Sequence, residues 1–281
     1  MIHALLRRAL PRRLYTRLGL ARETLGRARF RPYVATHRYG RRELSVHIAD
    51  EMGRSWYDHD WTTPAEIELL AARGRLRVGS RVFDVGAHQG VVAMMLADLV
   101  GGSGQVVAVE ATPHNAELAL RNAALNGLAR VEVRHAAGAD TPGLLHFSPR
   151  MNGHVAAEDE ASVAVRAVTV DELTDEFGAP QVLFVDVEGY ELHVLRGARA
   201  TLDAHRPDLF VEVHMGDGLE RFGDADDLLR LIPSGYEILV SRTEHGPYRP
   251  LIGARDELRH HSRLVALAGP IARAATGASA D

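Results

Sequence analysis

Short apolar runs alternate with helical patterns from residue 81 onward, and this alternation predicts a parallel sheet with crossover helices. The runs are apolar almost throughout, as strands are when helices cover both faces of a sheet. We expect strands at 81–85, 105–110, 130–135, 181–187 and 208–213. Helices are expected at 91–100, 114–126, 190–202 and 225–231.

Further patterns flank this core. Between residues 135 and 180, the segments 144–147 and 162–170 indicate an extra β excursion. Residues 236–240 predict a late strand, which could pair in antiparallel fashion with a segment near Leu251. An aromatic cluster at 56–61 precedes a helix whose first turn holds Pro64.

The N-terminus has a different pattern. Leu6, Leu10, Leu14 and Leu18 recur every four residues with arginines between them, which predicts a short amphipathic helix that is interrupted or begins at Pro11. Such an arm could pack on a partner, remain solvated, lie on a membrane surface or be disordered. We therefore divide the chain into a basic arm and lead-in (1–55), a main domain (56–255) and a C-terminal tail (256–281).

Two residue types are absent from the composition. The chain of 281 residues has no cysteine, which excludes disulfides, thiolate metal sites and a cysteine nucleophile. All 33 basic residues are arginine, so a Schiff-base lysine and the lysine of a phosphate-binding loop are excluded as well.

Charge is unevenly distributed along the chain. Residues 1–42 contain twelve arginines and one acid, Glu23, so they carry +11 while the remainder carries −15 of the net −4. An acidic body argues against nucleic acid binding by the core. No run of 18 apolar residues and no secretory signal is present, so we expect a cytoplasmic protein whose basic arm could contact a membrane surface or a partner.

The sequence D-V-G-A-H-Q-G, from Asp84 to Gly90, follows the first predicted strand and precedes a helix. A glycine turn there lets backbone amides approach a ligand closely. The glycine spacing differs from the G-x-G-x-x-G of nicotinamide sites, which argues against a dehydrogenase. The acid at the strand end suits a ligand with an amine-bearing portion, which S-adenosylmethionine has. His88 stands where glycine is common, and histidine tolerates positive φ better than most residues.

Two further acids extend this candidate cofactor site. Glu110 ends the next strand, where a carboxylate can accept hydrogen bonds from both ribose hydroxyls. After the third strand, residues 136–140 should pass beside the adenine, and Asp140 could accept a hydrogen bond from its amino group.

The later strands end in a second set of polar residues, V-D-V-E-G-Y-E (185–191) and V-E-V-H (211–214). Acids inside an apolar run are costly unless something uses or pairs them. Asp186, Glu188, Glu212 and His214 could therefore supply a general base, or they could hold a divalent ion such as Mg²⁺. We expect no metal; if one binds, Asp186, Glu212 and His214 are the candidate ligands.

Five segments in order resemble the FkbM family of methyltransferases, over roughly residues 64–214. Besides the glycine turn, these are V-E-A-T-P-H-N-A-E-L-A-L-R-N-A-A-L-N-G-L, V-T-V-D-E-L, F-V-D-V-E-G-Y-E-L-H-V-L-R-G-A and R-P-D-L-F-V-E-V-H. The resemblance implies a class I, Rossmann-like α/β fold: a doubly wound, mostly parallel seven-stranded sheet, here with an N-terminal helical extension. It implies S-adenosylmethionine as cofactor and O-methylation of a hydroxyl on a small molecule, glycan or lipid.

The resemblance also assigns residues. The cofactor would contact Asp84, Gly86, Ala87, His88, Gly90, Glu110 and Asp140. Asp186, Glu188 and His214 would be catalytic. Two positions depart from the family pattern, since Phe184 stands where lysine is usual and His88 where asparagine is usual. The alternative function is a non-catalytic, methyltransferase-like scaffold that acts through its arginine-rich arm.

Overall fold

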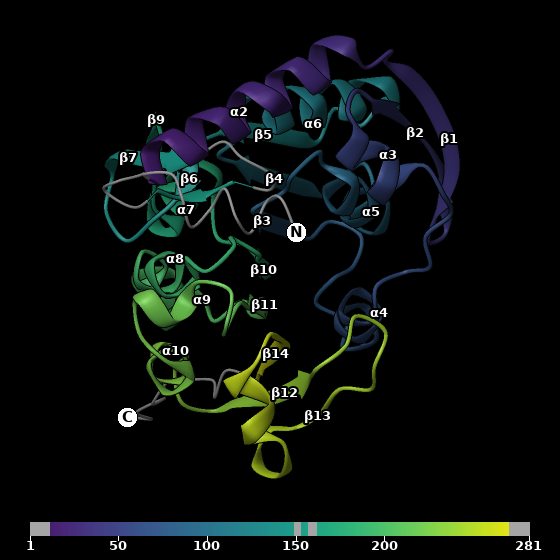
Figure 1. Cartoon of the computed structure of the whole chain (residues 1–281). Coiled ribbons are helices and arrows are strands. Elements are labelled where there is room, and N and C mark those ends of the chain that lie inside the picture. Colours follow the sequence, from purple (N-terminus) through teal and green to yellow (C-terminus); the bar gives the residue numbers. More distant parts are fainter. Residues whose placement is uncertain (1–11, 149–152, 157–161, 270–281) are drawn as a thin grey trace, which may run out of the picture.

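The structure is a computed structural model that describes residues 12–148, 153–156 and 162–269. An eight-stranded sheet runs through it in the order β13-β12-β14-β11-β10-β3-β4-β5 (Figure 1). Five adjacent strands are parallel, as predicted. They are β3 (Arg81–Val85), β4 (Gln105–Glu110), β5 (Val131–His135), β10 (Val182–Val185) and β11 (Asp208–Val213).

Helices cover both faces of this sheet, which explains why its strands are apolar throughout. Successive residues of β3 enter opposite cores: Val82 packs in the core that contains Met94, and Phe83 in the core that contains Leu195. The first face carries α4 (Ala65–Ala72), α5 (Val91–Val100) and α6 (Pro113–Leu125). The second carries α7 (Val170–Phe177), α8 (Glu191–Arg196), α9 (Arg199–His205) and α10 (Ala225–Leu231).

The winding of the sheet reverses between β3 and β10. From β3 the chain moves outward through β4 to β5, and then returns to β10 and β11 on the other side of β3. In an open parallel sheet, ligands bind beyond the carboxyl ends of the strands at such a reversal. The glycine turn after β3 and the acids after β10 therefore lie at the expected place.

The C-terminal part of the sheet is antiparallel and corrects one sequence-based boundary. Strand β14 (Ser262–Ala268) lies between β11 and β12 (Tyr236–Ser241), so the segment from 256 onward is not simply a tail. The two-residue strand β13 (Arg249–Pro250) pairs with β12 and adds an eighth strand to the seven expected. Short 3₁₀ helices lie at Leu219–Arg221, Leu251–Gly253 and Arg255–Arg259.

The excursion predicted between residues 135 and 180 forms a separate small sheet of order β6-β9-β7-β8. Its strands are β6 (Ala137–Gly138), β7 (Gly143–Ser148), β8 (His154–Val155) and β9 (Val163–Val168). The predicted strand 162–170 was too long, because Thr169 and Glu172 form a reciprocal capping box that begins α7.

The helix expected at 190–202 is divided into α8 and α9. The carbonyl of Gly197 accepts a hydrogen bond from the amide of Asp171. The Asp171 carboxylate in turn accepts hydrogen bonds from the amides of Ala200 and Thr201, at 3.1 and 2.8 Å, and so caps α9 from another helix. This tertiary contact, which leaves no local signal, interrupts the helical pattern.

The lead-in contains a hairpin that the sequence did not predict. Strands β1 (Tyr33–Tyr39) and β2 (Arg42–Ile48) pair in antiparallel fashion, and β2 buries Leu44, Val46 and Ile48 against the body. Residues 33–48 therefore belong to the body and not to an arm. Between the hairpin and α4 lies α3 (Glu51–Tyr57).

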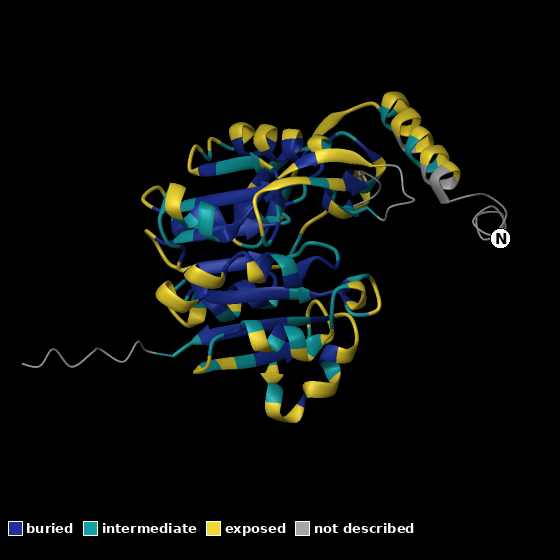
Figure 2. Cartoon of the chain, turned by 90° about the vertical axis from the view of Figure 1, so that its left-hand side faces the viewer, coloured by how far each residue is buried: buried dark blue, intermediate teal, exposed yellow. Residues whose placement is uncertain are grey.

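Helix α2 (Arg12–Arg29) projects from the body (Figure 2). Its described part starts at Arg12, so the prediction that the helix is interrupted or begins at Pro11 falls, with Leu6 and Leu10, outside the described residues. Leu14 and Leu18 are about half exposed. Within the described part of the chain, no helix is long and apolar enough to cross a membrane.

Candidate active site

The turn after β3 is built around Gly86. Its φ is 100°, and a Cβ atom there would lie 1.6 Å from the carbonyl oxygen of Asp186, so only glycine fits. The amides of Gly86 and Ala87 both donate to the carbonyl of Val109, at 2.8 and 3.0 Å. These contacts hold the ends of β3, β4 and β10 together.

His88 and Gly90 continue the turn in different roles. His88 has φ 49°, its amide donates to Glu110 Oε2 at 2.9 Å, and its Nδ1 lies 2.6 Å from the Tyr57 hydroxyl. Gly90 has φ 82° and begins α5, where a Cβ would lie 2.9 Å from that of Ala119. Gly90 therefore permits close helix packing but lines neither cavity described below.

Buried ionisable groups surround this turn. Glu110 is 4% exposed, and burial raises its pKa to about 7, although the amides of His88 and Thr112 donate to it. Burial, together with the charge of Glu110, also raises the pKa of Asp84 to about 7. Burial lowers the pKa of His88 to about 4, so its ring is neutral at pH 7. Asp84 Oδ2 has no hydrogen-bond partner among the described residues.

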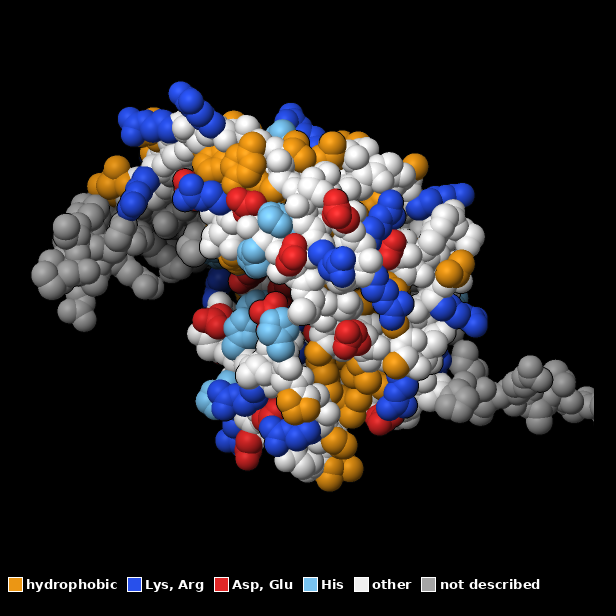
Figure 3. Space-filling view, turned by 90° about the vertical axis from the view of Figure 1, so that its right-hand side faces the viewer, with side chains coloured by type: hydrophobic (Ala, Val, Ile, Leu, Met, Phe, Trp, Pro, Cys, Tyr) orange, Lys and Arg blue, Asp and Glu red, His pale blue; other side chains and the backbone are white. Residues whose placement is uncertain are grey.

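Two cavities meet at the turn. The first, about 620 Å³ including space open to solvent, has Glu110 on one side and apolar walls that include Ala137, Phe147 and Tyr190. The second, about 1920 Å³ on the same measure, is lined by aromatic, acidic and histidine side chains. On the face shown in Figure 3, histidines and acids gather around a hollow. The residues common to both cavities are Trp56, Gly86, His88, Asp186 and Glu188.

The predicted cofactor residues divide between these cavities. Gly86, His88 and Glu110 line the first, while Ala87 and Asp84 line the second near the junction. Residues 136–138 line the first cavity, as expected, but Asp140 lies outside its lining. The Asp140 carboxylate is instead 2.9 Å from Nδ1 of His193.

The predicted catalytic residues converge. Nε2 of His214 lies 3.7 Å from Asp186 Oδ1 and 3.6 Å from Glu188 Oε2. The Asp186 side chain is 43% exposed, toward the cavities, and Glu188 has the positive φ of 53°. Although the Asp186 side chain opens onto the cavities, their walls desolvate it, and this desolvation and the carboxylate of Glu212 raise the pKa of Asp186 well above its usual value, while His214 opposes the shift.

His214 is 3% exposed and its Nδ1 lies 2.7 Å from Oε1 of Glu191, which is fully buried. Burial opposes the charged form, but the hydrogen bond to Glu191 and the nearby carboxylates raise the pKa of His214 to about 10. Glu191 was named in the sequence only as the third acid of its motif, and its pairing with His214 was missed.

Glu212 has partners of its own. Oε1 lies 2.8 Å from Nε2 of His261, and Oε2 accepts from Arg263 at 3.2 Å. The hydrogen bond from His261 and the charge of Arg263 lower the pKa of Glu212, against the effect of burial. His261 and Arg263 were missed because the sequence reading placed them in a tail. The signal was present, since the apolar run that begins at Leu264 is typical of a buried strand.

Phe184, which departs from the family pattern, lines neither cavity. It is 2% exposed and packs against Phe210, with ring centroids 5.1 Å apart. Its substitution for lysine therefore changes the packing behind the second cavity, not the described lining.

The sheet order, the glycine turn and the two joined cavities define a class I methyltransferase fold. Residues 84–239 match the methyltransferase FkbM domain, which is more than half of the chain. The chain therefore belongs to the FkbM methyltransferase family, as its sequence motifs implied. Among curated proteins, none matches this sequence.

Similar solved structures include an FkbM methyltransferase from Methylobacillus flagellatus, 20% identical with a TM-score of 0.44. That match covers 66% of this chain and 43% of the other, so this chain spans less than half of that protein. TrmN from Thermus thermophilus is 16% identical with a TM-score of 0.42, over 71% of this chain and 47% of its own. An S-adenosylmethionine-dependent O-methyltransferase from Thermotoga maritima is 15% identical with a TM-score of 0.45. That match covers 81% of this chain and 75% of the other.

Proposed function

We propose that this protein transfers the methyl group of S-adenosylmethionine to a hydroxyl oxygen of a small-molecule, glycan or lipid acceptor. The observation that carries the proposal is the pair of cavities that meet at Gly86, His88, Asp186 and Glu188. A bound methyl donor and an acceptor can thus approach each other while entering from different sides, as direct transfer requires.

The first cavity fits the cofactor by its hydrogen-bond acceptor and its apolar walls. The buried carboxylate of Glu110 faces the cavity and can accept hydrogen bonds from ribose hydroxyls, while Ala137, Phe147 and Tyr190 offer apolar surface to the adenine. Asp84 has an unpartnered buried oxygen near the junction, where it can pair with the ammonium group of the amino-acid portion. S-adenosylmethionine bound there supplies an electrophilic methyl group.

The protein's own groups then act on the acceptor. As the acceptor oxygen gains the methyl group it loses its proton, and the carboxylate of Asp186, exposed at the junction, is placed to take that proton. The C–S bond breaks with its electron pair left on sulfur, so no oxidant is needed. Trp56 and Tyr57 line the second cavity and can exclude water from the reacting atoms.

Calorimetric titration with S-adenosylmethionine tests the cofactor site. Replacing both Asp84→Asn and Glu110→Gln should weaken binding at least about a hundredfold, because two charge-assisted contacts of roughly 1.5–3 kcal/mol each are lost. Asp140→Asn is the matched control, since Asp140 lies outside the cavity lining, and should bind like the wild type. Equal affinity of the wild type and the double variant would refute the assignment.

A further inference from the structure

His214 presents a buried nitrogen to the junction of the cavities. Its Nδ1 is held by Glu191, whose carboxylate can only accept, so Nδ1 carries a proton and Nε2 is left to face Asp186 and Glu188. At 3.7 and 3.6 Å these two oxygens lie beyond hydrogen-bond range of Nε2. His214 is 3% exposed, and at these distances Nε2 is ion-paired with both carboxylates.

The spacing of these atoms allows all three residues to bind one ion. The donor atoms of Asp186, Glu188 and His214 all lie within 4.8 Å of one another. Bonds of about 2.0–2.2 Å to a tetrahedral ion place neighbouring ligand atoms about 3.3–3.6 Å apart. A direct hydrogen bond would instead draw them to about 2.9 Å. In metal sites, a histidine ligand commonly donates its other ring N–H to a carboxylate, which orients the ring. Glu191 is placed to do this for Nδ1 of His214.

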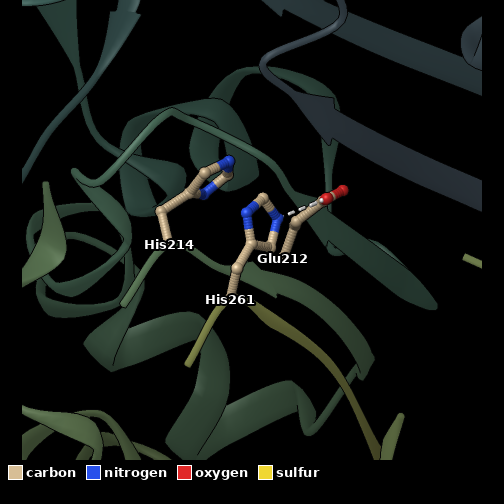
Figure 4. Close-up of side chains that lie close together, drawn as sticks. All are labelled: Glu212, His214 and His261. Atoms are coloured by element: carbon tan, nitrogen blue, oxygen red, sulfur yellow. Dashed lines mark hydrogen bonds and ion pairs between the residues drawn. The ribbon is translucent and has the colours of Figure 1, made fainter. Parts of the chain in front are cut away.

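A second cluster, Glu212, His214 and His261, also has its donor atoms within 4.8 Å. Figure 4 shows Glu212 joined to His261 and neither joined to His214. Glu212 is also bound by Arg263, whose positive charge lies where it would repel a metal ion. The first cluster is therefore the better site, and Glu188 replaces Glu212 among the expected ligands.

Charge favours the same choice. Three carboxylates, those of Asp186, Glu188 and Glu191, lie within 4 Å of the single imidazole of His214. Arg263 contacts Glu66 and Glu212. A divalent cation that displaced the proton from Nε2 would bring two positive charges, in place of one, to the carboxylates of Asp186 and Glu188.

We propose that Asp186, Glu188 and His214 bind a divalent metal ion at the junction of the two cavities, with Glu191 as the positioning residue for His214. Mixed oxygen and imidazole ligands suit Mn²⁺ or Zn²⁺, whereas Mg²⁺ prefers oxygen ligands alone. The role of the ion rests on the proposed function: an open coordination position there would take the acceptor oxygen and lower the pKa of its hydroxyl, and the carboxylate oxygen of Asp186 that does not bind the ion would accept the proton. Binding of the ion does not depend on that function.

Full-length protein freed of metal with a chelator can be titrated with Mn²⁺ and followed by electron paramagnetic resonance of the free ion. The only two tryptophans, Trp56 and Trp61, line the second cavity, so quenching of their fluorescence provides a second readout. We expect one saturable site. Asp186→Asn or His214→Ala should abolish it, and Glu191→Gln should weaken it about 10- to 100-fold.

Two control variants locate the ion. Glu212→Gln should retain Mn²⁺ binding, and so should Asp140→Asn, with folding checked by circular dichroism. Loss of binding in Glu212→Gln but not in Asp186→Asn would overturn the proposal in favour of the other cluster. Absence of Mn²⁺ and Zn²⁺ binding to the wild type at millimolar concentration would overturn it altogether.

Titration of the metal-free protein with S-adenosylmethionine separates this proposal from the proposed function. Cofactor binding without metal binding would refute the metal site and leave the methyltransferase proposal standing. Metal binding without cofactor binding would do the reverse.

Discussion

Glu110 makes cofactor affinity dependent on pH. Its pKa is raised to about 7 in the free protein, mainly by burial, and the ionised form is the one that accepts two ribose hydrogen bonds. Affinity for S-adenosylmethionine should therefore be highest above pH 7 and fall as the pH drops through 7, up to tenfold per pH unit for one group. Asp84, with a pKa also near 7, should steepen the fall.

Titration calorimetry of the wild type and Glu110→Gln between pH 5.5 and 8.5 checks this expectation, with the pH limits set about 1.5 units around the pKa. The variant should bind more weakly at pH 8.5, and its pH profile should be flatter. Comparing the two proteins removes the contribution of the ligand's own amino group. Identical slopes would show that Glu110 does not titrate on binding.

At this scale the sequence predicted the acids but not their partners. Asp84, Glu110, Asp186 and Glu188 could be found because a carboxylate at the end of an apolar strand is conspicuous. Which of them share a cavity, and that Asp140 turns to His193 instead, depends on side-chain directions that no linear pattern encodes. The contact of Tyr57 with His88 joins residues 31 positions apart, so no local sequence pattern could predict it either.

At the scale of elements, one side chain connects the hairpin, α6 and the glycine turn. Asn122 is fully buried; its Oδ1 accepts from the amide of His47 at 2.7 Å and its Nδ2 donates to the carbonyl of Gln89 at 2.9 Å. Asn122→Ala should lower the free energy of unfolding by roughly 2–4 kcal/mol, because the buried carbonyl of Gln89 and the partly buried amide of His47 lose their partners. Thermal denaturation should show a clear fall in Tm.

The neighbouring variant Asn126→Ala is the matched control. Asn126 accepts from the amide of Ser45, and its Nδ2 donates to the carbonyls of Ser45 and Asn122, which lie outside the glycine turn. Both variants should loosen the hairpin, but only Asn122→Ala should also weaken S-adenosylmethionine binding. An equal effect on affinity would mean that the turn does not depend on Asn122.

The elements that the sequence predicted best are those with strong local patterns. The bounds of β3, β4, β11 and α5 agree with the predicted ones, because apolar side chains bury most of each element. Those of α10 agree as well, and a capping box of Asp224 and Asp227 begins this helix. The hairpin β1–β2 was missed because its strands mix charged and apolar residues, and the division of α8 from α9 because Asp171 imposes it from a distant helix.

At the scale of the whole molecule, the two cavities arise where strand order reverses, whereas α2 contributes to neither. The described part of α2 combines arginines with exposed leucines at positions 14, 18 and 25, a pattern that suits an anionic lipid surface. If the arm attaches the protein to a lipid surface, a change in the charge of the arm should alter membrane binding but not cofactor affinity. A scaffold that works only through the arm has no need of the cofactor site.

Replacing Arg17, Arg27 and Arg29 with glutamine tests this separation. Each arginine near an anionic surface is worth about 1 kcal/mol, so binding to phosphatidylglycerol vesicles should weaken roughly a hundredfold in a co-sedimentation assay, while S-adenosylmethionine affinity stays unchanged. Three exposed arginines of the body provide a control with the same change in net charge. They are Arg199, Arg230 and Arg259. Equal vesicle binding by the two triple variants would show that net charge, not the arm, governs attachment. A loss of S-adenosylmethionine affinity in the arm variant would show that the arm and the cofactor site are not independent.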